Sequence, residues 1–218
     1  MTNVHLFVGP SAVGMKIPVP DDIEVHPPAR RGAVHQLIER HSVPGVILLA
    51  DGTFHSYPAV GHRELRDAIE SGWQAWGLCS MGAIRAAEML PLGMRGYGAV
   101  FQAFAEDPEF ADDEVALVHG LEPPFRPVSE PMIHIRAYFD HLRMTGALAP
   151  EHIDQALAHF KCRWYAERSL PALVEYLTDL GHLTALEDIR DFDRFRLKTR
   201  DLESFLTDRP WTLKETHA

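Results

Sequence analysis

The chain has 218 residues and a formal net charge of -10, from 21 Lys and Arg against 31 Asp and Glu. This acidic balance opposes binding to a polyanion, so we expect no nucleic-acid partner. No run of about 18 apolar residues suggests a membrane span, the first residues lack a secretory signal pattern, and two cysteines are too few for a disulfide scaffold. We therefore expect a cytoplasmic globular protein that does not bind membranes.

Strand and helix patterns alternate in the first half of the chain. Short apolar runs predict strands at 4–8, 23–26, 46–50 and 73–79. Apolar residues at helical spacing predict helices over 33–41, 62–71, 81–90 and 99–105. The alternation predicts an α/β fold, a small mostly parallel sheet with flanking helices.

The strand signal ends after the proline-rich connector at 123–127. Amphipathic patterns then predict helices over 130–143, 151–166, 170–180 and 200–207. We therefore expect two domains, an α/β core at 1–125 and a helical C-terminal region at 126–218. The aromatic residues of that region recur at helical spacing, so we expect a packed core rather than a cofactor site, and no cofactor is predicted.

In a parallel sheet, the loops that leave strands and enter helices lie on one edge, where ligands usually bind. On that edge we expect substrate-binding residues from several loops and from the helices that follow them. The candidates are Gly9, Pro10, Ser11, Arg31, Arg63, Arg85 and Glu88. Arg85 and Glu88 are three residues apart on one helix, so they pair with each other, or Arg85 faces an anionic substrate.

Ser80 is the main candidate for chemistry, because it stands where the apolar run at 73–79 ends and a small-residue helix begins. The start of a helix presents unpaired N–H groups, and those of Met81 and Gly82 are candidate oxyanion donors. The alternative is that the Ser80 hydroxyl only caps the helix. The segment lacks the GxSxG elbow of ordinary esterases, since Leu78 occupies the first glycine position.

A catalytic serine needs a base, and His62 on the same expected edge is the best candidate. Asp51 or Glu64 is expected to orient its imidazole. Cys79 is an alternative nucleophile or sulfur carrier, but at the end of a buried strand it fits an inert thiol better.

His119, at the end of the apolar run 115–118, either makes a structural hydrogen bond or lines the site. The acidic residues at 106–109 and 112–114 do not have the spacing of a calcium loop. The histidines form no HxxxH pair with a third ligand in view, so we expect no metal site.

Seven segments occur in order over about the first 130 residues: GPS at 9–11, PPARRG at 27–32, ADGTF at 50–54, GHRE at 61–64, CSMGAIRAAE at 79–88, GMRGYG at 93–98 and DDEVALVHG at 112–120. Together they resemble the TfuA-like protein family. This resemblance implies an accessory protein that works beside a YcaO enzyme, the ATP-dependent catalyst that activates a peptide backbone amide. Such pairs install thioamides in peptides or proteins.

One departure affects a candidate residue. The family pattern is close to Val-Trp-His-Lys-Glu, whereas this chain has VGHRE at 60–64. Arginine cannot act as a base at neutral pH, so only a cationic role remains for Arg63.

These observations lead to one mechanistic hypothesis. Ser80, activated by His62, attacks the C-terminal thiocarboxylate of a ubiquitin-like sulfur-carrier protein and liberates sulfide. The sulfide is released beside the amide that the YcaO-type enzyme has activated in the peptide substrate. A second hypothesis is a non-catalytic adaptor that recruits or allosterically activates the YcaO enzyme. A third is a plain hydrolase of another ester or peptide.

Overall fold

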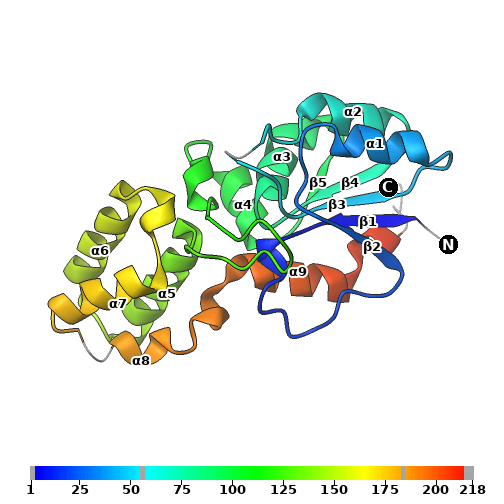
Figure 1. The fold of residues 1–218 in the computed structure, drawn as a ribbon. Helices are drawn as coiled ribbons and strands as arrows, with labels where there is room; N and C mark the ends of the chain where they lie inside the picture. The colour runs from blue at the N-terminus through cyan, green and yellow to red at the C-terminus, as the bar shows by residue number, and fades with distance from the viewer. Residues whose placement is uncertain (1–2, 55–56, 183–184, 214–218) are drawn as a thin grey trace. The chain divides into compact units, whose positions relative to one another are not determined.

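The computed structural model describes residues 3–54, 57–182 and 185–213, and the chain forms two compact units. The first unit contains residues up to 110 together with residues from 198 onward, and the second contains residues 111–197. Figure 1 follows the chain through both units. No helix among the described residues is long and apolar enough to cross a bilayer.

A five-stranded parallel sheet forms the centre of the first unit, with the strand order β2-β1-β3-β4-β5. The strands are β1 (Val4–Phe7), β2 (Ile23–His26), β3 (Val46–Leu49), β4 (Gln74–Gly77) and β5 (Arg95–Gly96). This sheet confirms the α/β prediction. From β1 the chain continues to its neighbour β2 on one side of the sheet, and from β3 it continues to its neighbour β4 on the other side. A topological switch point therefore lies between the carboxyl ends of β1 and β3.

Helices cover both faces of this sheet (Figure 1). The helices of this unit are α1 (Ala33–Arg40), α2 (His62–Glu70), α3 (Met81–Met89), α4 (Ala99–Glu106) and α9 (Leu197–Asp208). Successive side chains of a strand point to opposite faces. Phe7 therefore packs with α1, α2 and α3, whereas Leu6 packs with Phe205 of α9.

The position of α9 differs from the expected arrangement of the C-terminal region. The sequence pattern groups this helix with the other helices after residue 126, but its apolar side chains belong to the buried cluster of the sheet. The Asp201 carboxylate also accepts hydrogen bonds from the Ala99 and Val100 N–H groups at the start of α4, at 3.0 and 2.9 Å. Helix α9 is thus part of the first unit.

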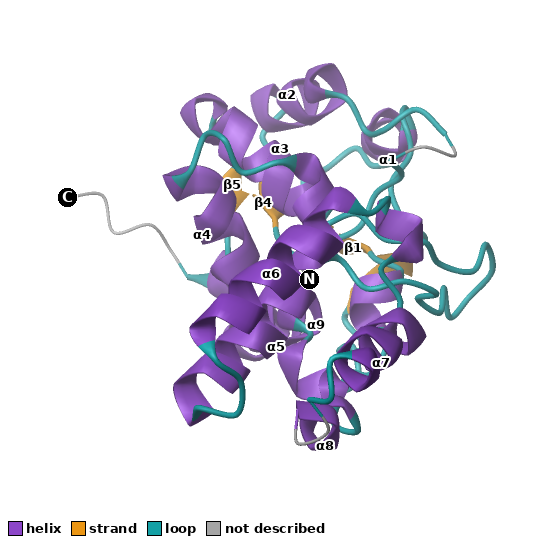
Figure 2. Ribbon diagram, turned by 90° about the vertical axis from the view of Figure 1, so that its left-hand side faces the viewer, coloured by secondary structure: helices purple, strands orange, loops and turns teal. Residues whose placement is uncertain are grey.

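The second unit contains helices and loops, and its described residues form no strand (Figure 2). Its helices are α5 (Met132–Thr145), α6 (Pro150–Cys162), α7 (Leu170–Asp179) and α8 (Ala185–Ile189). They share a buried cluster that contains Phe139 and Phe160, as expected for an aromatic core. Trp164 is an exception to the prediction that the aromatic residues of this region pack in its core, because its side chain is exposed.

Candidate functional site

The carboxyl end of β3 is where the loops of the predicted edge meet. The Ala50 carbonyl accepts hydrogen bonds from the N–H groups of Ser80 and Gly82, at 3.2 and 3.3 Å. The Asp51 carbonyl accepts one from Ala29 N–H at 2.9 Å, in the loop after β2. The loops after β2, β3 and β4 therefore converge on two adjacent residues, as the parallel topology predicts.

The Asp51 side chain joins the loop after β1 to this meeting point. Its Oδ2 accepts hydrogen bonds from the N–H groups of Gly9 and Ser11, at 2.8 and 2.9 Å. Its Oδ1 accepts a hydrogen bond from the Ser11 hydroxyl at 2.7 Å. Gly9, Pro10, Ser11 and Asp51 are all buried. The carboxylate thus ties the two strand ends of the switch point together, and its hydrogen bonds go to this loop rather than to His62.

The turn from β4 into α3 is held by two close approaches of backbone. A Cβ on Gly77 would lie 2.0 Å from the Gly82 carbonyl oxygen, and one on Gly82 would lie 1.6 Å from the Leu49 carbonyl oxygen. Cys79 has a φ of 64°, a conformation that non-glycine residues rarely adopt. Only glycine allows α3 to start this close to the end of β3.

Ser80 occupies the N-cap position of α3, and its side chain makes no capping hydrogen bond. The hydroxyl is therefore not used to cap the helix, although Ser80 is only 2% exposed. Among the two predicted oxyanion donors, the Gly82 N–H is already bonded to Ala50. The described residues leave the Met81 N–H without an acceptor, so it is the donor that remains available at this helix start.

His62 lies with a different group of side chains. Its Nε2 is 2.8 Å from Oε2 of Glu88, which also accepts a hydrogen bond from Nη1 of Arg85 at 2.6 Å. Arg85 Nε donates to the Val60 carbonyl at 3.0 Å. The structure thus brings together His62, Arg85 and Glu88, and the two residues on α3 pair as one of the sequence alternatives predicted.

The same arrangement separates His62 from Ser80. Glu88 lies eight residues beyond Ser80 on α3, which corresponds to about 12 Å along the helix axis. No hydrogen bond joins Ser80 to His62 in the part of the chain that the structure describes. Direct proton transfer between them requires the His62–Glu88 contact to break.

Glu64 anchors the starts of two helices. Its Oε2 accepts hydrogen bonds from the N–H groups of Gly32 and Val34 at the start of α1, both at 3.0 Å. Its Oε1 accepts a hydrogen bond from the Gly61 N–H at the start of α2, at 2.7 Å. These are the orphan donors that helix starts leave unpaired. Glu64 therefore holds the loops around the site in place, and its hydrogen bonds do not go to the His62 ring.

A cavity of about 480 Å³ opens between β2 and α1, next to the loop at 27–32. Three of its lining residues are the arginines Arg30, Arg31 and Arg40, and no carboxylate is among the lining residues that the structure describes. The stacked rings of Phe7 and His26, with centroids 4.9 Å apart, form part of its apolar wall. In a chain with a net charge of -10, such a cavity is suited to an anionic ligand with an apolar portion.

A protein-family model described as TfuA-like protein matches residues 51–169, more than half of the chain. The chain belongs to the TfuA-like protein family. No curated protein matches it. TfuA-like proteins are associated with YcaO enzymes in general, and membership suggests a role linked to YcaO-dependent thioamidation.

Two other predicted residues of this TfuA-like protein have partners within their own unit. Arg63 is exposed and lies 3.7 Å from Asp67 on its own helix. His119 belongs to the second unit, where its Nδ1 is 2.7 Å from the Gly120 carbonyl oxygen and its ring contacts Phe125. Its contacts are those of a structural histidine.

Sequence reasoning missed two ionisable residues beside the turn, Lys198 and Asp201 of α9, both buried. The Cys79 thiol donates to the Lys198 carbonyl at 3.1 Å. Burial, reinforced by the charges of Asp201 and Asp51, raises the pKa of the Cys79 thiol well above its usual value. The thiol is protonated at neutral pH, which fits the inert role. The sequence signal for these two residues is their spacing, because residues three apart in a helix lie on the same face of it.

Proposed function

We propose that this TfuA-like protein supports YcaO-dependent backbone thioamidation by releasing sulfide from the C-terminal thiocarboxylate of a ubiquitin-like sulfur carrier. In the proposed reaction the Ser80 oxygen attacks the thiocarboxylate carbon. The carbon–sulfur bond breaks, hydrosulfide leaves, and the carrier is held as an ester on Ser80. Water then hydrolyses the ester and returns a carboxylate and the free serine.

The state of the Ser80 hydroxyl is the observation that carries this proposal. It stands at a helix start, makes no capping hydrogen bond, and is followed by the Met81 N–H, which has no acceptor among the described residues. A serine whose hydroxyl is not used for capping, next to such a donor, has the parts that an acyl transfer needs. The tight packing of Gly77 and Gly82 fixes both groups in position.

We propose His62 as the base, with its ring released from Glu88 before the reaction. His62 is 54% exposed on its side chain and is bound to Glu88, so binding of the carrier must release it before it can accept the Ser80 proton. Catalytic hydrogen bonds are often long or absent in a free enzyme and form only with substrate. The arginine-lined cavity supports an anionic partner, because it offers Arg30 and Arg31 near the same loops.

The direct test is sulfide release from a purified thiocarboxylated carrier, without the YcaO enzyme. Ser80→Ala is expected to abolish release, and Ser71→Ala is expected to match wild type. Ser71 is the matched control because it is an exposed serine at the end of α2, bonded to the Asp67 carbonyl at 2.7 Å. If Ser80→Ala releases sulfide as fast as wild type, the nucleophile is another group.

A non-catalytic adaptor is the second candidate. It is favoured by the burial of Ser80 and by apolar side chains that the second unit exposes, Leu121, Val128 and Trp164. Deleting everything after residue 127 does not test it, because α9 would be lost from the sheet. The better test measures thioamidation with Trp164→Ser and with Met144→Ser as an exposed control in the same unit. Loss with Trp164→Ser alone, together with full activity in Ser80→Ala, supports the adaptor.

A further inference from the structure

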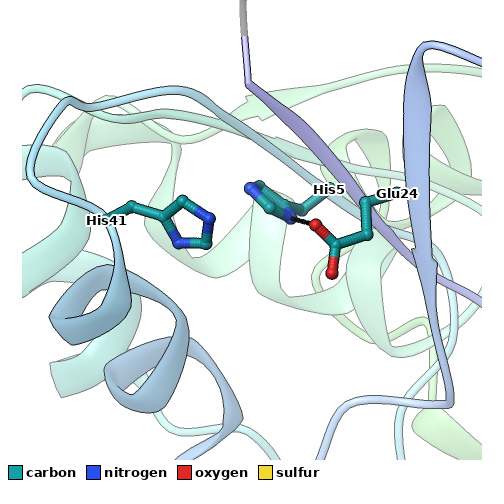
Figure 3. A group of neighbouring side chains, drawn as sticks. All are labelled: His5, Glu24 and His41. Atoms are coloured by element: carbon teal, nitrogen blue, oxygen red, sulfur yellow. Dashed lines mark ion pairs between the residues drawn. The ribbon is translucent and has the colours of Figure 1, made fainter.

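Three histidines and a glutamate gather where β1 and β2 meet the end of α1, and Figure 3 shows three of these side chains, His5, Glu24 and His41. His5 on β1 is directly paired with Glu24 on β2, so both side chains point to the same face of the sheet. His26 follows two residues later on β2 and shares that face. His41 is the C-cap of α1, and its ring centroid lies 4.7 Å from that of His5.

The polar atoms of this cluster are close enough to share one ion. His5 Nδ1 is 3.4 Å from Glu24 Oε2 and 3.0 Å from His26 Nε2, and His26 Nε2 is 3.7 Å from Glu24 Oε1. His5, Glu24 and His41 each offer one ligand atom, and these three atoms lie within 4.8 Å of one another. Two ligands of a tetrahedral zinc ion are about 3.4 Å apart, given bonds of about 2.0–2.1 Å.

The other nitrogen of the His5 ring lacks a partner. His5 is 0% exposed, and its buried Nε2 has no hydrogen-bond partner among the described residues. One ring binds one ion through one nitrogen, so Nε2 is the alternative donor to Nδ1. Buried polar atoms without a partner are rare in folded proteins and call for a specific explanation. Figure 3 shows the His5 ring between Glu24 on the neighbouring strand and His41 at the end of α1.

The tautomer of His41 also suits metal binding. His41 Nδ1 is 2.9 Å from the Leu37 carbonyl oxygen, which fixes the proton on Nδ1 and leaves the lone pair on Nε2. A backbone carbonyl that orients the ring in this way is the usual partner of a metal-binding histidine.

We propose that His5, Glu24 and His41 bind a divalent zinc-type ion, with His26 adjoining it as a further nitrogen donor. Imidazole and carboxylate ligands suit zinc, whereas magnesium and calcium prefer oxygen donors alone. The ion ties the edge strand β2 to the end of α1, away from the Ser80 turn. The ligands are spread over residues 5 to 41 without a motif spacing, which is why the sequence predicted no metal site.

The test is zinc binding by the untagged 218-residue chain, measured by isothermal titration and by competition with a chromophoric chelator. Wild type is expected to bind one zinc per chain and to gain thermal stability from it. His41→Ala and Glu24→Gln change partly or fully exposed residues, and each is expected to weaken binding at least tenfold and to abolish the thermal shift. His35→Ala is the matched control, since His35 is a histidine on the same helix, bonded to Asp67.

Cobalt gives a second readout that does not depend on stability. Bound Co²⁺ is expected to show the strong visible bands of tetrahedral coordination in wild type and His35→Ala, and to lose them in His41→Ala. The proposal is overturned if wild type takes up no zinc at micromolar concentration. It is also overturned if both ligand variants bind like wild type, or if His35→Ala loses binding to the same extent.

Discussion

Replacing Gly82 by alanine tests the packing that positions the Ser80 turn. The added Cβ would lie 1.6 Å from the Leu49 carbonyl oxygen, so α3 must move away from β3 by roughly 2 Å to restore an ordinary van der Waals distance. That movement stretches the hydrogen bonds from Ser80 and Gly82 to the Ala50 carbonyl. The variant is therefore expected to lose stability.

The expected size of the loss follows from three contributions. Overpacking in a filled site costs about 1–3 kcal/mol, and the two weakened backbone hydrogen bonds cost about 1 kcal/mol each. Alanine regains about 1 kcal/mol through its better helix propensity. We therefore expect Gly82→Ala to lower the free energy of unfolding by about 2–4 kcal/mol.

The assay is urea unfolding followed by tryptophan fluorescence, since Trp73, Trp76 and Trp211 all lie in the sheet unit and are buried. Gly61→Ala is the matched control. Gly61 has a φ of -93°, and an added Cβ there would meet only Glu64 Oε1, at 3.7 Å. It should change stability by less than about 1 kcal/mol. The reasoning is refuted if Gly82→Ala unfolds within 1 kcal/mol of wild type.

Three further changes have defined outcomes. Glu64→Gln should destabilise the chain by about 2 kcal/mol in urea unfolding, because a charged acceptor of several N–H groups is lost, whereas the exposed Glu39→Gln should be neutral. Burial alone would raise the pKa of Glu130, but the His134 hydrogen bond and Arg196 outweigh it and lower the pKa. The stabilisation it gives is present above about pH 4.5 and is lost as the pH falls through the lowered pKa. Glu130→Gln should therefore have a lower urea midpoint than wild type at pH 7, and the difference between the two midpoints should disappear as the pH falls to 3. A difference that stays constant from pH 7 to 3 would contradict this. A thiol reagent should modify the exposed Cys162 quickly in the native protein and should modify the buried Cys79 only after unfolding. Rapid modification of both cysteines in the native protein would contradict the burial of Cys79.

The strands and most helices were predictable because their signals are local. Aliphatic runs such as 46–49 mark strands covered on both faces, and the apolar spacing of 33–40 marks a helix. β5 was missed because it has only two residues and lies in a glycine-rich segment. The return of α9 to the sheet was missed because a helical pattern does not say which apolar surface the helix will cover.

The site was predictable as a set of loops but not as a set of contacts. The parallel topology correctly brings the loops at 9–11, 29–31 and 80–82 to the end of β3. The sequence does not reveal which donors a carboxylate will accept. Asp51 and Glu64 are satisfied by backbone N–H groups from loops 30 to 40 residues away, which no local pattern encodes. His62 likewise meets Glu88 through the packing of two helices.

The most direct test of the central claim is to identify the residue that carries the carrier's acyl group during turnover. Wild-type protein mixed with thiocarboxylated carrier, quenched rapidly in acid and digested, is expected to give a peptide with an ester on Ser80 as sulfide appears. Ser80→Ala is expected to give neither the ester nor sulfide, with its rate lowered at least about a hundredfold. Acyl transfer to Cys79, or sulfide release by Ser80→Ala at the wild-type rate, would contradict the claim.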